Sequence, residues 1–153
     1  MGPLVGGLMP ALILWTTERS IIKMSKVIVT GHGGYATAMR RNLAMLVGEL
    51  EGFYFVDFNE EDSLDILQDN FSQVLAQFSP EEEVLFACDL AGGSPFRTAA
   101  VLCTDHPSWA VVAGINTSAY SELSFNLELP AHELAELACT VAKETILMYP
   151  PKE

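Results

Sequence analysis

The sequence predicts an α/β fold: a doubly wound, mainly parallel four-stranded sheet with helices on both faces. From Met24 onward, short apolar runs typical of strands alternate with longer stretches of helical period, and turn residues separate them. The run Val84–Cys88 is apolar at every position, as expected for a strand that helices cover on both faces. With right-handed crossovers this alternation builds a doubly wound sandwich, for which we expect the flavodoxin-like strand order 2-1-3-4.

The first strand and the first helix flank a glycine-rich turn. Lys26–Thr30 is an apolar run that predicts a strand. Tyr35–Val47 has helical period and places Leu43 and Leu46 on one face, and Gly48 is a suitable residue to end the helix.

The second strand and helix precede the central apolar run. Phe53–Phe58 predicts the second strand, and the acidic segment after it leads into a helix over Asp62–Phe78 with apolar residues at i, i+3, i+4 spacing. Pro80 and three glutamates end that helix, and Val84–Cys88 follows as the third strand.

The last third of the chain is mostly helical. A helix is predicted over Ser94–Thr104 and a fourth strand over Trp109–Ala113, and two more helices over Thr117–Leu127 and Ala131–Lys143. The tail Thr145–Tyr149, TILMY, is rich in β-branched and aromatic residues, which predicts a last short strand.

The size and charge of the chain limit its possible functions. With 153 residues, half of them hydrophobic, it is long enough for one domain with a substantial core, which we place at residues 24–153. The formal net charge of -12 repels phosphate backbones and argues against nucleic acid or an anionic membrane as a partner. It is compatible with protein partners that carry a basic face.

Residues 1–23 are predicted to be an extension outside the fold. The segment is apolar up to Trp15, but no basic residues precede the apolar part, and Pro3 and Pro10 interrupt a run too short to span a bilayer. We therefore expect neither an export signal nor direct membrane insertion.

The cysteines suggest neither a metal site nor a disulfide framework. Cys88, Cys103 and Cys139 are odd in number and lack CxxC spacing. We expect buried thiols in a reducing cytoplasm, no metal site and no cofactor.

Two glycine-rich turns carry the candidate site. His32 follows the first strand in TGHGG, and Asp89 follows the third strand in DLAGGSPFR. In the second turn, Gly92 and Gly93 permit a tight turn and a close approach to a ligand, while Ser94 is a favoured N-cap residue followed by a proline suited to position N1. The first-turn amides of such a helix favour an anion, so a phosphoryl group fits there.

The predicted strand order brings the two turns to one crevice. The first and third strands are neighbours in the order 2-1-3-4, so we expect Asp89 to accept a hydrogen bond from one ring nitrogen of His32 and leave the other nitrogen free to attack. Ser94, its neighbouring amides and the backbone of Gly33 and Gly34 are candidate donors to a phosphoryl group.

Simpler roles for the same residues are also open. His32 could be a turn histidine satisfied by backbone groups, and Asp89 a helix-capping carboxylate. The pairing of the two turns favours a functional site over either role. Arg97 is expected to be solvated, and His106 and His132 are expected to be surface residues.

Over Met24–Tyr149 the sequence resembles the mannose-class enzyme IIA proteins of the bacterial phosphoenolpyruvate-dependent sugar phosphotransferase system. The resemblance rests on GHGG with His32, on DLAGGSPF with Asp89 and Ser94, on the run VVAGIN at 111–116, and on the overall length. The combination of GHGG with GGSPFR looks most like the N-acetylgalactosamine and galactosamine branch. Gly31 and Ala91 depart from the residues of the best-known members, a threonine and an aromatic residue respectively.

The resemblance implies a cytoplasmic phosphotransferase component. His32 would accept a phosphoryl group on Nε2 from the carrier protein HPr and pass it to enzyme IIB, which phosphorylates the sugar as the membrane components IIC and IID import it. Asp89 would hold the other ring nitrogen. The resemblance also implies a homodimer in which the C-terminal strand TILMY is exchanged between subunits as an antiparallel strand.

Two other functions are compatible with these residues. One is the phosphotransferase subunit of a dihydroxyacetone kinase, which uses a similar domain. The other is a non-catalytic flavodoxin-like module that binds a small anion at the turn 92–95 and signals to a partner.

Overall fold

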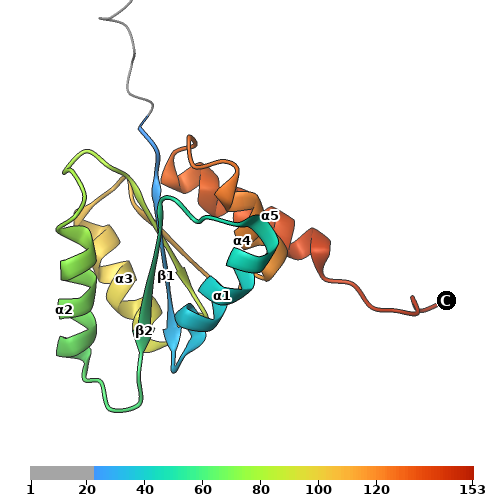
Figure 1. Cartoon of the computed structure of the whole chain (residues 1–153), viewed down its shortest axis with the longest axis horizontal. Helices are drawn as coiled ribbons and strands as arrows, with labels where there is room; N and C mark the ends of the chain where they lie inside the picture. Colours follow the sequence, from blue (N-terminus) through green and yellow to red (C-terminus); the bar gives the residue numbers. More distant parts are fainter. Residues whose placement is uncertain (1–22) are drawn as a thin grey trace, which may run out of the picture.

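The computed structural model describes residues 23–153, which contain a four-stranded parallel sheet in the order β2-β1-β3-β4 (Figure 1). The predicted fold class and strand order are therefore confirmed. The predicted extension at 1–23 lies, except for Lys23, outside the described residues. The elements are β1 (Lys26–His32), α1 (Tyr35–Val47), β2 (Phe53–Phe58), α2 (Leu64–Leu75), β3 (Val84–Cys88), α3 (Ser94–Asp105), β4 (Ala110–Ala113), α4 (Thr117–Ser124) and α5 (Ala131–Thr145).

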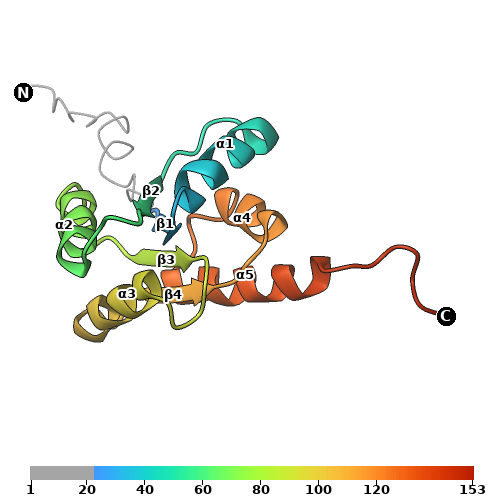
Figure 2. The ribbon, with the colours of Figure 1, turned by 90° about the horizontal axis from the view of Figure 1, so that it is seen from below.

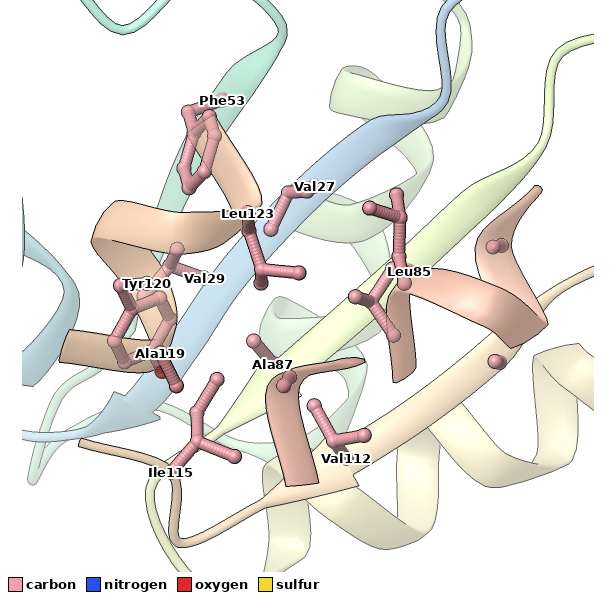
Figure 3. Packing of buried hydrophobic residues seen from close by; sticks show 14 of the residues in the cluster. Val27, Val29, Phe53, Leu85, Ala87, Val112, Ile115, Ala119, Tyr120 and Leu123 are labelled. Atoms are coloured by element: carbon pink, nitrogen blue, oxygen red, sulfur yellow. The ribbon is translucent and has the colours of Figure 1, made fainter. Parts of the chain in front are cut away.

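Helices cover both faces of the sheet, with α2 and α3 on one side and α1, α4 and α5 on the other (Figure 2). Val27 and Val29 of β1 pack on the side of α1, α4 and α5, and Ile28 packs on the side of α2 and α3. This alternation follows from the strand period of two. Figure 3 shows the first of these cores, in which Tyr120 and Leu123 of α4 lie over the strands.

The central strand β3 is buried at all five positions, as its apolar sequence predicts. β1 lies between β2 and β3, and Thr30 pairs with Cys88 near the carboxyl ends of β1 and β3. The residues that follow these two partners therefore emerge at the same edge of the sheet. This is the edge at which open α/β sheets bind ligands.

β1 continues two residues beyond its predicted end at Thr30. Gly31 pairs with Asp57 and His32 pairs with Phe58 of β2, and these contacts keep the backbone extended. His32 is thus the last residue of a strand instead of a turn residue, so the sheet itself fixes its backbone.

Several helix boundaries and faces differ from the predictions. Helix α2 begins after Ser63, whose side chain accepts the Ile66 N–H at 3.2 Å, and it ends at Leu75, so it is shorter than predicted at both ends. Helix α4 ends at Ser124 instead of Leu127. In α1, Leu43 is buried, but Leu46 is 58 % exposed, so the predicted apolar face was wrong at that position.

The predicted strand at Thr145–Tyr149 is absent from the described chain. Helix α5 extends to Thr145, whose hydroxyl accepts a hydrogen bond from Asn116 Nδ2 at 2.8 Å. This extension directs the tail away from the sheet, as both views show (Figures 1 and 2). The side chains of the tail are exposed, from 63 % at Met148 to 89 % at Tyr149.

The three cysteines differ in burial, contrary to the prediction that all are buried. Cys88 is buried in β3, Cys103 is half-buried in α3, and Cys139 is exposed on α5. Burial raises the pKa of the Cys88 thiol to about 12. Among the helices of residues 23–153, none is long and apolar enough to cross a membrane.

Candidate active site

His32 and Asp89 meet at the carboxyl edge of the sheet, as predicted. Asp89 follows β3 directly, and its N–H donates to the Thr30 carbonyl of β1 at 3.2 Å. Its Oδ2 atom accepts the backbone N–H of His32 at 2.9 Å and lies 2.9 Å from His32 Nδ1. One carboxylate oxygen thus holds both the main chain and the ring of the histidine.

This pairing decides which ring nitrogen is free. A carboxylate oxygen only accepts hydrogen bonds, so the short contact to Nδ1 requires a proton on Nδ1. In the neutral ring the lone pair then lies on Nε2. The imidazole is 44 % exposed, whereas the Asp89 side chain is 17 % exposed. The ring that carries Nε2 is therefore accessible to solvent, and the carboxylate that orients it is mostly shielded.

The imidazole lies close to both Phe58 and the start of α3. The two rings make an edge-to-face contact with centroids 5.7 Å apart. At the start of α3, a Cβ atom built on Gly93 would lie 2.8 Å from His32 Cε1 and 3.5 Å from Nε2. The backbone φ of Gly93 is an ordinary -69°, so this glycine is needed for space and not for conformation.

Helix α3 begins at Ser94 as predicted, but its N-cap lies one residue before the predicted cap. Gly93 is the N-cap residue, Ser94 the first helical residue and Pro95 the second. The Gly93 N–H donates to the Leu90 carbonyl at 3.2 Å and closes a turn. Within this turn Gly92 has a positive φ of 76°. The N–H groups of the first helical turn remain as donors, and the helix dipole favours an anion in front of them.

The start of α1, which follows His32, already holds an anion of the protein. The carboxylate of Asp57 accepts the Thr37 N–H of α1 at 3.0 Å and also bonds the Thr37 hydroxyl. The Gly33 N–H, one of the predicted phosphoryl donors, donates to the Phe58 carbonyl at 2.7 Å and is therefore in use. A phosphoryl group beside Nε2 can therefore bind at the N-terminus of α3, whereas the N-terminus of α1 is occupied by Asp57.

Asp57 was missed from the sequence, although its position carried a signal. It stands at the end of β2, next to the strand that ends in His32, and carboxyl ends of parallel strands converge at one edge. Its aromatic neighbours suggested only a strand. The helix start that it caps could be located only once β2 was placed beside β1.

The other two histidines lie on the surface, as predicted. His106 stacks on Trp109 with ring centroids 3.7 Å apart, and His132 Nε2 lies 2.9 Å from the Pro107 carbonyl oxygen. Within residues 23–153 no group of three or more histidine, cysteine or acidic side chains is arranged to hold a metal ion.

Comparisons with known sequences identify one family. The sequence model of EIIA-man, described as "PTS system fructose IIA component", matches residues 26–120. The chain is 32 % identical over 93 residues to the PTS system fructose-specific EIIA component of Bacillus subtilis (strain 168), a match that covers 61 % of this chain and 64 % of the relative. It is 31 % identical over 90 residues to the PTS system mannose-specific EIIAB component of Escherichia coli (strain K12), which covers 59 % of this chain and 28 % of the relative. The chain therefore spans less than two thirds of either relative.

A solved structure extends the similarity to most of the chain. The mannose/sorbose specific IIA subunit of the phosphotransferase system from Enterococcus faecalis superposes with a TM-score of 0.77 at 26 % sequence identity. The match covers 85 % of this chain and 98 % of that one.

The contact between Gly93 and the imidazole predicts a reactivity change. In Gly93→Ala the new methyl group displaces the ring from Asp89, at a cost typical of overpacking of about 1–3 kcal/mol, so the rate of His32 carbethoxylation by diethyl pyrocarbonate should fall about fivefold or more. Mass spectrometry measures the rate, with His132 of the same molecule as reference. Gly34→Ala is the matched control, because its Cβ would have no neighbour within 4 Å and its φ is not positive. Equal rates in the two variants would contradict the contact.

Proposed function

Because this chain belongs to the EIIA-man family, we propose that it is the phosphocarrier of a mannose-class sugar phosphotransferase system, with His32 Nε2 as the phosphoryl acceptor. The observation that carries the proposal is the contact of Asp89 Oδ2 with both the Nδ1 atom and the backbone N–H of His32. It leaves Nε2 as the nucleophile beside the start of α3. The donor is phosphorylated HPr, the acceptor is enzyme IIB, and the exchange takes place in the cytoplasm.

The first transfer follows from this geometry. The Nε2 lone pair attacks the phosphorus atom of the phosphohistidine on HPr. The new P–Nε2 bond forms as the donor P–N bond breaks, and the donor ring nitrogen keeps the electron pair of the broken bond. The ring of His32 gains positive character as Nε2 forms the bond. The carboxylate of Asp89 stabilises this charge while the proton stays on Nδ1.

The start of α3 stabilises the charge on the transferred group. First-turn amides, the Ser94 hydroxyl and the helix dipole face the oxygens of the phosphoryl group, while Gly92 and Gly93 let it approach the backbone. The Gly33 N–H is already bonded to the Phe58 carbonyl, so it is not a donor to the phosphoryl group. The proposed role of Gly33 is instead to end β1 directly after an exposed histidine. In the transfer to enzyme IIB, the IIB nucleophile attacks the phosphorus atom in line with the P–Nε2 bond. That bond breaks, and Nε2 keeps its electron pair.

The proposed cargo is an amino sugar of the N-acetylgalactosamine type. This choice rests on GHGG and GGSPFR alone. The two sequence relatives described above are named for fructose and mannose.

We further propose a homodimer that exchanges the C-terminal tails. Among residues 23–153, β4 is an edge strand whose one strand neighbour is β3, and unpaired edges favour the addition of another strand. A groove of about 600 Å³ runs beside β4 between α3 and α5, with Cys103, Trp109 and Cys139 among its lining residues. The exposed apolar tail 146–149 of a second subunit has the composition to fill it as an antiparallel strand.

The phosphocarrier proposal predicts a covalent phosphohistidine. Incubation with phosphoenolpyruvate, enzyme I and HPr should add one acid-labile phosphate to the wild-type chain and none to His32→Gln, as measured by intact-mass spectrometry. His132→Gln is the control, since it also removes an exposed histidine and should be labelled like the wild type. Label that persists in His32→Gln would refute the assignment of the acceptor.

Asp89→Asn tests the orienting role of the carboxylate in the same assay. The amide can present either its oxygen or its NH₂ group to Nδ1, so the tautomer is no longer fixed. The transfer rate should fall about 10²-fold or more while circular dichroism stays unchanged. A wild-type transfer rate in Asp89→Asn would show that Asp89 has only a structural role in the turn.

The dimer proposal predicts that the tail holds the subunits together. A chain that ends at Thr145 keeps the hydrogen bond to Asn116 but lacks the apolar tail, so it should sediment as a monomer. A chain that ends at Tyr149 is the control and should sediment as a dimer with the full-length protein. Equal sedimentation of the two truncated chains would contradict strand exchange.

A further inference from the structure

The second carboxylate oxygen of Asp89 is buried without a hydrogen bond. Oδ2 takes both contacts with His32, whereas Oδ1 has no hydrogen-bond partner among the described residues and almost no solvent contact. An unpaired carboxylate oxygen is costly to bury, so something in the fold must keep water from it.

The ring of Tyr35 and this carboxyl group both lie beside Gly31. A Cβ atom at Gly31 would lie 2.5 Å from Tyr35 Cδ1 and 2.8 Å from Asp89 Cγ, so the ring and the carboxyl group both approach the same point of β1. Gly31 does not have a positive φ, so the glycine serves to make room and not to form a turn. Any larger residue at this position would force Tyr35 and Asp89 apart.

Tyr120 of α4 fixes the position of the Tyr35 ring. The two hydroxyl oxygens are 2.7 Å apart, and Tyr120 is fully buried in the core, where Figure 3 shows it near Val29 of β1. Burial raises the pKa of both tyrosines above the ordinary value, so both hydroxyls stay neutral beside the carboxylate. Tyr120 of α4 therefore holds Tyr35 in place next to the carboxyl group that bonds His32.

We propose that Tyr35, anchored by Tyr120, is a positioning residue that keeps water from Asp89 Oδ1 and keeps the carboxylate directed at His32. Water at Oδ1 would donate to the carboxylate and weaken its hold on the Nδ1 proton. Among the described residues, only His32 donates hydrogen bonds to the Asp89 carboxylate. Shielding of Oδ1 from water keeps competing donors away from that side of the carboxylate, and a hydrogen bond with less water around it is electrostatically stronger. This inference rests on the proposed function of His32 for its kinetic consequence but not for its structural one.

The tautomer of His32 tests the structural part directly. In the wild type, ¹⁵N NMR of the histidine ring above its titration range should show the proton on Nδ1. In Tyr35→Ala, water reaches Oδ1 and the share of the Nε2–H tautomer should rise. Tyr54→Ala is the matched control, because it also removes a half-buried tyrosine ring, whose centroid lies 4.8 Å from that of Phe78. This variant should leave the tautomer unchanged.

The kinetics should separate positioning from packing. Loss of a partner that orients an active-site group typically costs about 10–100-fold in activity, so kcat for phosphoryl transfer from HPr should fall by that factor in Tyr35→Ala with KM for HPr unchanged. Tyr35→Phe and Tyr120→Phe each lose the hydroxyl contact but keep the ring, and both should shift the tautomer in the same direction by a smaller amount. These two variants decide the question if Tyr35→Ala does not fold.

A wild-type tautomer and kcat in Tyr35→Ala, or a wild-type tautomer in both phenylalanine variants, would overturn the inference. The proposed function fails separately, through label retained in His32→Gln. In that case the tautomer measurement still tests the link from Tyr35 to His32.

Discussion

The structure depends most on the carboxylate oxygen of Asp89 that accepts two hydrogen bonds from His32. The ring bond selects the tautomer, and the backbone bond fixes the distance between the two strand ends. Both bonds require β1 and β3 to be neighbours in parallel register, with Thr30 beside Cys88. The doubly wound topology meets this requirement, because it places the exits of these two strands at one edge of the sheet.

Around this pair, glycines determine how closely the other groups approach. Gly31 admits Tyr35 to the side of Asp89, and Gly93 admits the imidazole to the start of α3. Neither has a positive φ, so their value lies in the missing side chain. Asp57 occupies the start of α1 and leaves α3 as the place for a phosphoryl group. The resulting site exposes the ring of His32 to solvent and buries Oδ1 of Asp89.

Much of this arrangement could be predicted from local sequence, and the rest depends on distant contacts. The all-apolar run Val84–Cys88 marked the central strand, and the two glycine-rich turns marked His32 and Asp89. The role of Tyr35 could not be read in advance, because a tyrosine at a helix start has no local signature and its partner lies 85 residues away. The tail TILMY has strand composition, but within the described residues it pairs with no strand, because α5 extends to Thr145 and directs the tail away from the sheet.

The most direct measurement is NMR of the phosphorylated chain with ¹⁵N-labelled histidine. If Asp89 holds the Nδ1 proton throughout the transfer, the phosphorus atom must couple to Nε2 of His32, and Nδ1 must keep its proton. Coupling of the phosphorus atom to Nδ1 would contradict the account, because that nitrogen could then not donate to the carboxylate of Asp89.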